Sequence, residues 1–489
     1  MAALAAAVPH TARAQCPDGS PPPCAARGPA TAPQASVAVL TFGVLSRDSS
    51  DSYLGEGLAD AISARLGQLA RMTVTSRTAV RRLRGVGMLP PVTLGRALSV
   101  AHLVSGTLLR TGGRLRVTIE LVRAGTGTQV WSGQFVRDAD DVLAIETEVA
   151  GTLAVRIAGP LTGAERAALG VRPTRVAEAY DLYLRGRFLF NQQTREGLER
   201  SLQLFDAAIA RDSGFALAHV AVADTYFWLT DDFMSPREAY PKMKAAVDRA
   251  LLIDSTLARA HTLLGAILLS YDWDRTAAER EFRRAIALDS TDATAHFYYA
   301  YLFGYASPAG LAEMELAQRF DPLNPMINSE LVGSLKAAGR SADAIALVQR
   351  TIALDSTQFH AWETLGDTYL ATGRTDDAIA AYQHLLALRW TRGEASLVEA
   401  YSRAGRRDDV TRALAELEAR ATREYVSPFL VAFAYAVAGD ADRAFAWLDR
   451  ALEDRSGWLI DLRNLPAFSS LHEDPRYAVL LRRITSEHR

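Results

Sequence analysis

The sequence predicts an α+β domain at the N-terminus, followed by an all-α solenoid of helical hairpins. Hydrophobic and polar residues alternate between Leu115 and Leu121, which indicates a strand with one buried face. Beyond residue 177, aspartates that follow apolar segments recur at spacings of 42, 35, 32 and 34: Asp212, Asp254, Asp289, Asp321 and Asp355. Glycines recur at spacings of 34, 32 and 34: Gly339, Gly373, Gly405 and Gly439. Such fixed periods are typical of stacked helical repeats.

The composition is that of a folded protein with no global electrostatic target. The chain has 489 residues, of which 49% are hydrophobic and 22% are charged, and its formal net charge is -2. This balance argues against general attraction to nucleic acid or to an anionic membrane. Arg81, Arg82 and Arg84 form the clearest basic cluster, and a solvated face explains it better than a binding patch.

The first 35 residues are interpreted as a signal-like segment and a Pro-rich linker. The opening residues are small and apolar and end in Ala12-Arg13-Ala14, which predicts export, most simply to the periplasm. Cys16 and Cys24, the only two cysteines, would then form a disulfide. The alternative is an Ala-rich tail on a cytoplasmic protein. No later stretch is long and apolar enough to predict a transmembrane segment.

Residues 36–161 are predicted to form the α/β domain. Strands are expected at residues 36–42 and 72–75, with an amphipathic helix over 54–69 between them and a short helix at 93–100. An antiparallel meander follows over 102–110, 115–121 and 129–136. Gly112-Gly113 suits its first tight turn. Asp140 and Asp141 are placed to begin a closing helix.

Several segments of this domain occur in an order that resembles the TolB-type amino-terminal domain. These segments are VAVLTF, Tyr53 to Leu58, VSGTLLRTGGRLRVTIELV, GTQVWS and DVLAIETEVA. Thr41 departs from the pattern, because the family usually has Pro there. The resemblance implies a small α/β module without established catalytic residues, of the kind found before tetratricopeptide repeats in bacterial chains. Residues 453–459 and 474–476 resemble the usual terminus of the same proteins.

Residues 177–454 are predicted to form a tetratricopeptide repeat solenoid of about eight helical pairs, with residues 455–489 as a C-terminal capping segment. The unit from Phe359 to Arg392 fits the repeat signature best, through Trp362, Leu365, Gly366, Tyr369, Ala378 and Tyr382. The recurring glycines are expected at positive φ after each first helix. His219, His261 and His296 recur in successive repeats, too far apart to share a metal, and are interpreted as packing residues.

The solenoid predicts a non-enzymatic scaffold that binds a protein or peptide partner, with no cofactor, metal or nucleic acid. The tryptophans and tyrosines are assigned to the core, and the chain has neither kinase motifs nor a nucleophile elbow. Repeat positions two, five, nine and twelve should face the groove. They select Phe227, Phe297, Tyr301, Lys336, His360 and Asp367 as partner-binding residues.

Two alternatives stay open. The groove could be filled by the chain's own N-terminal domain or C-terminal tail. The protein could also be a sensory or regulatory module whose α/β domain binds a small ligand.

Overall fold

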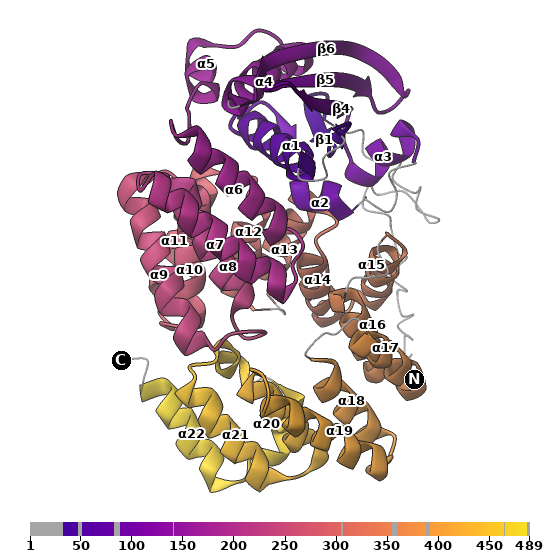
Figure 1. The fold of residues 1–489 in the computed structure, drawn as a ribbon. Coiled ribbons are helices and arrows are strands. Elements are labelled where there is room, and N and C mark those ends of the chain that lie inside the picture. The colour runs from indigo at the N-terminus through magenta and orange to yellow at the C-terminus, as the bar shows by residue number, and fades with distance from the viewer. Residues whose placement is uncertain are drawn as a thin grey trace, which may run out of the picture.

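A sheet domain comes first and helical hairpins follow (Figure 1). The structure is a computed structural model that describes residues 33–46, 51–82, 89–139, 141–304, 307–354, 359–387, 392–463 and 465–486. Cys16, Cys24, Arg84, Asp140 and Asp355 lie outside these ranges, so their predicted roles stay predictions.

The sheet is mixed, with strand order β3-β1-β4-β5-β6, and β2 pairs with β4 off this path. β1 runs parallel to β3 and β4, while β4, β5 and β6 form the expected antiparallel meander. Gly112 and Gly113 turn it with φ of 58° and 77°, values that suit glycine. The strands are β1 Ser36–Val39, β2 Gly43–Val44, β3 Thr73–Val74, β4 His102–Thr111, β5 Arg114–Arg123 and β6 Thr128–Asp138.

Helices cover both faces of this sheet. One face packs against α1 and α4 through the alternating side chains of β5, from Leu115 to Leu121. Part of the other face packs against α2 and α3 through Leu103 and Ala124. The helices of this domain are α1 Ser52–Gly67, α2 Arg77–Arg82, α3 Pro91–Leu98, α4 Val142–Ala158 and α5 Gly163–Leu169.

Eight consecutive antiparallel helix pairs make up the solenoid, in a tetratricopeptide-like arrangement (Figure 1). The first four pairs are α6 Ala177–Phe190 with α7 Arg195–Arg211, α8 Ala216–Leu229 with α9 Pro236–Ile253, α10 Ala258–Ser270 with α11 Arg275–Leu288, and α12 Ala293–Tyr301 with α13 Pro308–Phe320. The last four are α14 Pro325–Ala337 with α15 Ser341–Leu354, α16 Phe359–Ala371 with α17 Thr375–Ala387, α18 Gly393–Arg403 with α19 Arg407–Ala421, and α20 Pro428–Ala438 with α21 Ala441–Glu453.

The recurring aspartates and glycines lie at equivalent points of successive helical hairpins. The recurring aspartates at 212, 254, 289 and 321 directly follow α7, α9, α11 and α13, and three of them accept a hydrogen bond from the main chain two residues later. The glycines at 339, 373, 405 and 439 have φ between 69° and 83°, as expected for residues that end the first helix of each pair.

The first helices of the pairs form the inner side of the stack. Neighbouring first helices contact one another, as α8 does α10 and α14 does α16, whereas neighbouring second helices are farther apart. A stack that is tighter on one side curves toward that side. Residues on the free faces of these first helices therefore form the inner face of the solenoid.

The sheet domain is docked on the first repeat. Tyr180 and Leu184 of α6 belong to the same hydrophobic core as α1, α4 and the sheet. A Cβ on Gly57 of α1 would come within 3.0 Å of the Leu184 side chain, so the two helices approach closely there. Leu323, between α13 and α14, packs into the core on the other face of the sheet.

The C-terminal segment returns to the second and third repeats. It contains η3 Gly457–Asp461, η4 Pro466–Leu471 and α22 Pro475–Ser486. Arg455 donates to the carbonyl oxygen of Tyr271 at 3.0 Å and stacks on the rings of Tyr271 and Trp273. The carbonyl oxygen of Glu453 accepts from Arg237 of α9 at 3.0 Å. We call residues 453–458 the clasp, because they join the last repeat to the second and third.

Candidate functional site

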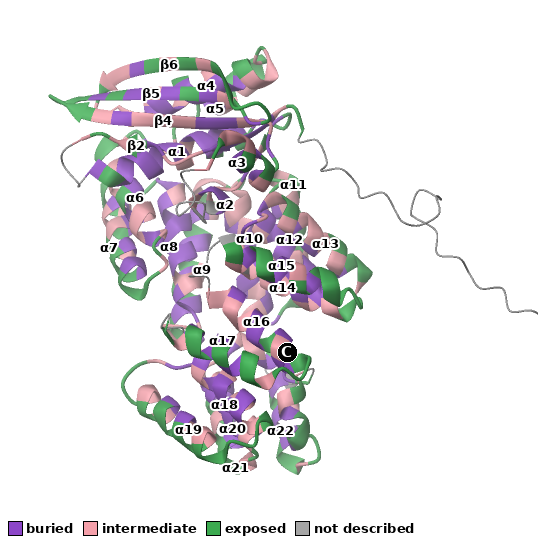
Figure 2. Ribbon diagram, turned by 90° about the vertical axis from the view of Figure 1, so that its right-hand side faces the viewer, coloured by how far each residue is buried: buried purple, intermediate pink, exposed green. Residues whose placement is uncertain are grey.

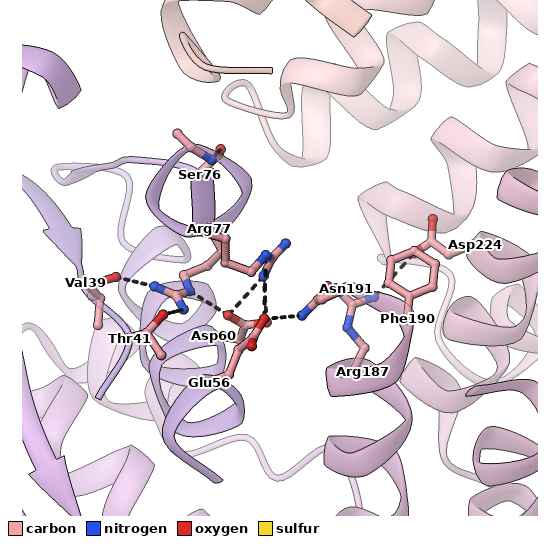
Figure 3. Close-up of polar contacts among 12 residues, drawn as sticks. Val39, Thr41, Glu56, Asp60, Ser76, Arg77, Arg187, Phe190, Asn191 and Asp224 are labelled. Carbon is pink, nitrogen blue, oxygen red and sulfur yellow. Dashed lines mark hydrogen bonds and ion pairs between the residues drawn. The ribbon is translucent and has the colours of Figure 1, made fainter. Parts of the chain in front are cut away.

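The most elaborate polar cluster of the described residues lies where the sheet domain meets the solenoid (Figure 3). Its first half belongs to α1 and α2. Arg77 donates to Asp60 through Nε at 2.5 Å, and to the carbonyl oxygen of Val39 and the hydroxyl of Thr41. Arg81 approaches both oxygens of Asp60, at 3.2 and 3.1 Å. The carboxylate of Asp60 thus fixes two guanidinium groups of α2 on α1.

The second half belongs to the inner face of the first three repeats. Asn191, directly after α6, donates to Glu56 Oε1 of α1 at 2.8 Å and so joins the two halves. Arg259 of α10 donates to Asp224 Oδ1 of α8 through Nε at 2.9 Å and Nη2 at 2.6 Å. Nη1 of Arg187, on α6, lies 3.9 Å from the other oxygen of Asp224, which is a long ion-pair distance. The guanidinium of Arg187 lies over the ring of Phe190.

Cations and anions alternate in this cluster. Four guanidinium groups (Arg77, Arg81, Arg187 and Arg259) pair with the carboxylates of Glu56, Asp60 and Asp224. The carboxylate of Asp292 also attracts Arg259. Burial by itself raises the pKa of Asp60, but Arg81, and after it Arg77 and Arg187, outweigh burial and hold that pKa below its usual value. The side chains of Arg187 and Arg259 stay 24% and 31% exposed, so their remaining N–H donors can reach a ligand.

A second, fully internal cluster joins the same two parts of the molecule. Glu146 of α4 accepts from the hydroxyl of Tyr180 at 2.8 Å, and its other oxygen lies 3.5 Å from Nη2 of Arg65. Burial raises the pKa of Glu146 to about 7, although Tyr180 and Arg65 lower it in part. No ligand could reach this carboxyl without unpacking the core, so its role is structural.

The predicted partner-binding residues are spread along the inner side, and not all of them are open to a partner. Phe297 is only 3% exposed and packs on Tyr298 and Tyr301, so it is a core residue. Phe227 is half-buried and lies edge-on against Tyr298. Three others, Tyr301, Lys336 and His360, are half-buried. Asp367 is exposed and accepts a hydrogen bond from the hydroxyl of Tyr382 at 2.6 Å.

Two other expectations from the sequence meet direct observations. The side chain of Arg81 is 17% exposed and pairs with Asp60. The prediction that Arg81 lies on a solvated face was therefore wrong. His261 and His296 each approach a carboxylate of their own hairpin at 2.7 Å and a loop carbonyl at 3.1 Å, which ties successive hairpins together.

In the described part of the chain no group of ligating side chains suits a metal ion.

The sequence contained a usable signal for half of the cluster. Arg187 and Asp224 occupy repeat position nine and Arg259 occupies position two, so the register that selected Phe227 and Tyr301 also places them on the inner face. Glu56, Asp60 and Arg77 had no such signal, because their proximity to α6 depends on how the sheet domain docks.

Comparison with known proteins gives partial similarities. No family model matches the chain. It is 26% identical over 205 residues to the Rhizobium meliloti (strain 1021) protein named "Putative adenylate cyclase 3", covering 42% of this chain and 35% of that protein. It is 25% identical over 191 residues to human superkiller complex protein 3, covering 36% of this chain and 11% of that protein. The chain therefore spans about a third and about a tenth of these relatives.

Solved structures with helical repeats are similar to it at low overall scores. One is a tetratricopeptide protein of Thermus thermophilus, TTC0263, with 18% identity, a TM-score of 0.32, and coverage of 37% of this chain and 98% of that one. Another is the Cut9-Hcn1 hetero-tetramer of the APC/C, with 15% identity, a TM-score of 0.44, and coverage of 70% and 66%. The helix pairing and the recurring aspartates and glycines identify the repeats in this chain. No helix among the described residues has the length and apolar character needed to span a membrane.

Proposed function

We propose that the protein is a non-enzymatic scaffold that binds an extended, acidic segment of a partner protein along the inner face of its first repeats. The observation that carries this proposal is the sharing of Asp224 by Arg187 and Arg259. One carboxylate saturates neither guanidinium, and both side chains are partly exposed. A carboxylate of a partner would complete them with charge-assisted hydrogen bonds.

Aromatic groups near this site suit the same kind of ligand. Phe227 lies on α8 one turn beyond Asp224, and Tyr301 lies two repeats farther along the inner side. Half-buried rings of this kind offer apolar area at little cost in conformational entropy. An extended segment with a carboxylate and an apolar side chain a few residues apart would satisfy both.

The proposal is tested by affinity capture and mass spectrometry with two matched double variants. Arg187→Gln with Arg259→Gln removes the inner-face charges. Arg200→Gln with Arg283→Gln removes two exposed charges from the second helices α7 and α11. We expect a partner that is captured by the wild type and by the outer-face variant but lost with the inner-face variant. A partner retained by both variants would show that binding lies elsewhere.

A second candidate function is small-ligand binding by the sheet domain. A hollow of about 200 Å³ lies on the sheet face that α2 and α3 leave partly open, lined by Ser105, Gly106, Thr107, Thr118 and Glu120. Hydroxyls and one carboxylate suit a polar ligand with hydroxyl or amine groups. Thr118→Trp would fill the hollow, and a polar small molecule that co-purifies with the wild type but not with this variant would favour this function.

The TolB-type relationship of residues 36–161 and the export of the chain are part of the same proposal. They are supported by the motif order and by the Ala12-Arg13-Ala14 ending. N-terminal sequencing of the mature protein together with cell fractionation tests the second: an intact Met1 on a cytoplasmic protein contradicts export.

A further inference from the structure

The outermost strand of the sheet, β6, pairs along one edge only in the described part of the chain, and its sequence is nearly symmetric about its centre. β6 is the last strand of the sheet and pairs only with β5 among the described residues. Figures 1 and 2 both show it at the outer margin of the sheet domain, with no labelled element beyond it. Edge strands expose a row of main-chain donors and acceptors that can pair with another strand.

The register shows which main-chain groups of β6 face outward. Ala139 donates to the carbonyl oxygen of Gly113 at 2.8 Å. Counting back along the ladder from this bond, the odd-numbered residues from Trp131 to Arg137 are those that bond β5. The even-numbered residues, Ser132 and Gln134 among them, therefore direct their N–H and C=O groups away from the sheet. The Val136 carbonyl oxygen accepts from the side chain of Arg137 at 2.8 Å, as an outward group would.

The order of apolar and polar side chains along β6 is nearly the same when the strand is followed in either direction from its centre. About Gly133, the sequence places Ser132 against Gln134, Trp131 against Phe135 and Val130 against Val136. In an antiparallel pair of two such strands each of these residues would lie opposite its counterpart. Apolar residues then meet apolar residues on both faces, which is the pairing that stabilises a sheet. A heterologous partner would have no reason to reproduce this symmetry.

We propose that the protein forms a two-fold symmetric dimer in which β6 pairs antiparallel with β6 of a second copy, with the axis at Gly133. Residues 132 and 134 then exchange main-chain hydrogen bonds with residues 134 and 132 of the other copy. The two central glycines face each other in the wide position between these bonds. A Cβ at Gly133 would lie 2.3 Å from the Trp131 ring, so the missing side chain leaves room for the indole beside the axis.

Two features limit the strength of this pairing. The register shift between Leu121 and Val122 leaves Val130 as the extra residue of a bulge, and bulges shorten the stretch of edge that can pair. Arg137 must also leave the Val136 carbonyl oxygen before that group can bond. We therefore expect a dimer that forms and dissociates with concentration, and not an obligate one.

The first test is the mass of the full chain in solution as a function of concentration. Val130 is 45% exposed in one copy, so Val130→Lys leaves the monomer intact but places a charge against Val136 of the other copy. Val479 on α22 is 46% exposed and far along the chain, so Val479→Lys is the matched control. Sedimentation equilibrium should show a monomer–dimer equilibrium for the wild type and the control. Val130→Lys should raise the dissociation constant at least tenfold.

The second test fixes the register. In a chain with Cys16→Ser and Cys24→Ser, an equimolar mixture of Ser132→Cys and Gln134→Cys proteins should form disulfide-linked dimers faster than either protein alone, because residues 132 and 134 are opposite across the axis. A chain that is monomeric at all concentrations overturns the proposal. So does a dimer that Val130→Lys leaves unchanged, or one in which the mixture cross-links no faster than its components.

Discussion

At the scale of single residues, the repeats depend on one recurring contact between a glycine and an aromatic ring. Gly186, Gly265 and Gly366 occupy the same position in the first helices of three hairpins. A Cβ added to them would lie 2.4, 2.4 and 2.3 Å from the rings of Phe205, Phe282 and Tyr382, respectively. Those rings are fully buried against the glycine backbone. Only glycine lets the two helices of these hairpins approach so closely.

Gly366→Leu should therefore destabilise the protein by overpacking. We expect a loss of about 1–3 kcal/mol in the free energy of unfolding, measured by urea denaturation. The matched control is Gly151→Leu, since nothing lies within 4 Å of a Cβ at Gly151, which is also within a helix. Equal stability of the two variants would contradict the close contact between α16 and α17.

The buried carboxyl of Glu146 should make stability depend on pH. Its pKa in the folded protein is raised to about 7 above the usual 4.5, first by burial, so the folded state holds a proton that the unfolded state releases. The stabilisation is present below about pH 4.5 and is lost as pH rises through 7, with a total of about 3 kcal/mol for a shift of this size.

Glu146→Gln should make this decline less steep but not abolish it, because burial raises the pKa of Asp231 to about 7 as well. Glu148→Gln, on the same helix but 43% exposed, should keep the full decline. Unfolding by urea between pH 5 and pH 8 measures the slope. A Glu146→Gln protein that loses stability over this range as steeply as the wild type would show that other groups account for the whole decline.

At the scale of elements, long periodic segments were predictable and short ones were not. The meander, the closing helix and the paired helices with their aspartate and glycine markers follow from local periodicity, which the sequence contains. β2, α2 and α5, with two, six and seven residues, were missed. Segments this short have little intrinsic preference for helix or strand, because local hydrogen bonds alone do not stabilise them. Contacts with residues distant in sequence stabilise them instead, as the ion pair between Arg77 and Asp60 does for α2.

The candidate site divides in the same way. Arg187, Asp224 and Arg259 lie at repeat positions that the register predicts to face inward, whereas Glu56 and Asp60 join them only through the docking of two domains. The prediction of Phe297 as a binding residue shows the limit of the register. That position does lie on the inner side, but the neighbouring rings of Tyr298 and Tyr301 fill the space in front of it.

The dependence of α2 on Asp60 gives a prediction for that element. Asp60→Asn would remove the nearest anion of Arg77 and Arg81, whose side chains are 9% and 17% exposed, and would leave Arg81 only the more distant carboxylate of Glu56 at 3.7 Å. We expect a loss of about 3 kcal/mol and faster amide hydrogen exchange over residues 77–82. Asp248→Asn, which removes an exposed partner of Lys244, should change neither. Unchanged protection of α2 in the Asp60 variant would contradict this dependence.

At the scale of the whole molecule, the clasp should hold the last repeat against the second and third repeats. Arg455→Ala removes the hydrogen bond to Tyr271 and the stacking on Trp273. We expect a larger radius of gyration by small-angle X-ray scattering and faster proteolysis near residue 455, with helix content unchanged. Arg450→Ala is the control, because Arg450 stacks on Trp447 of its own helix. Equal radii for the two variants would mean that these repeats stay together without the clasp.

The clasp also bears on how quickly a partner could arrive. An extended chain can approach the inner surface of an open solenoid directly. Contacts between distant repeats, such as those of the clasp, must break before a chain can enter past them. When such contacts re-form around the bound chain, they slow association and dissociation alike and leave the affinity unchanged. We therefore expect the clasp to act as a kinetic gate, with partner on-rates that rise when Arg455 is removed while the affinity changes little.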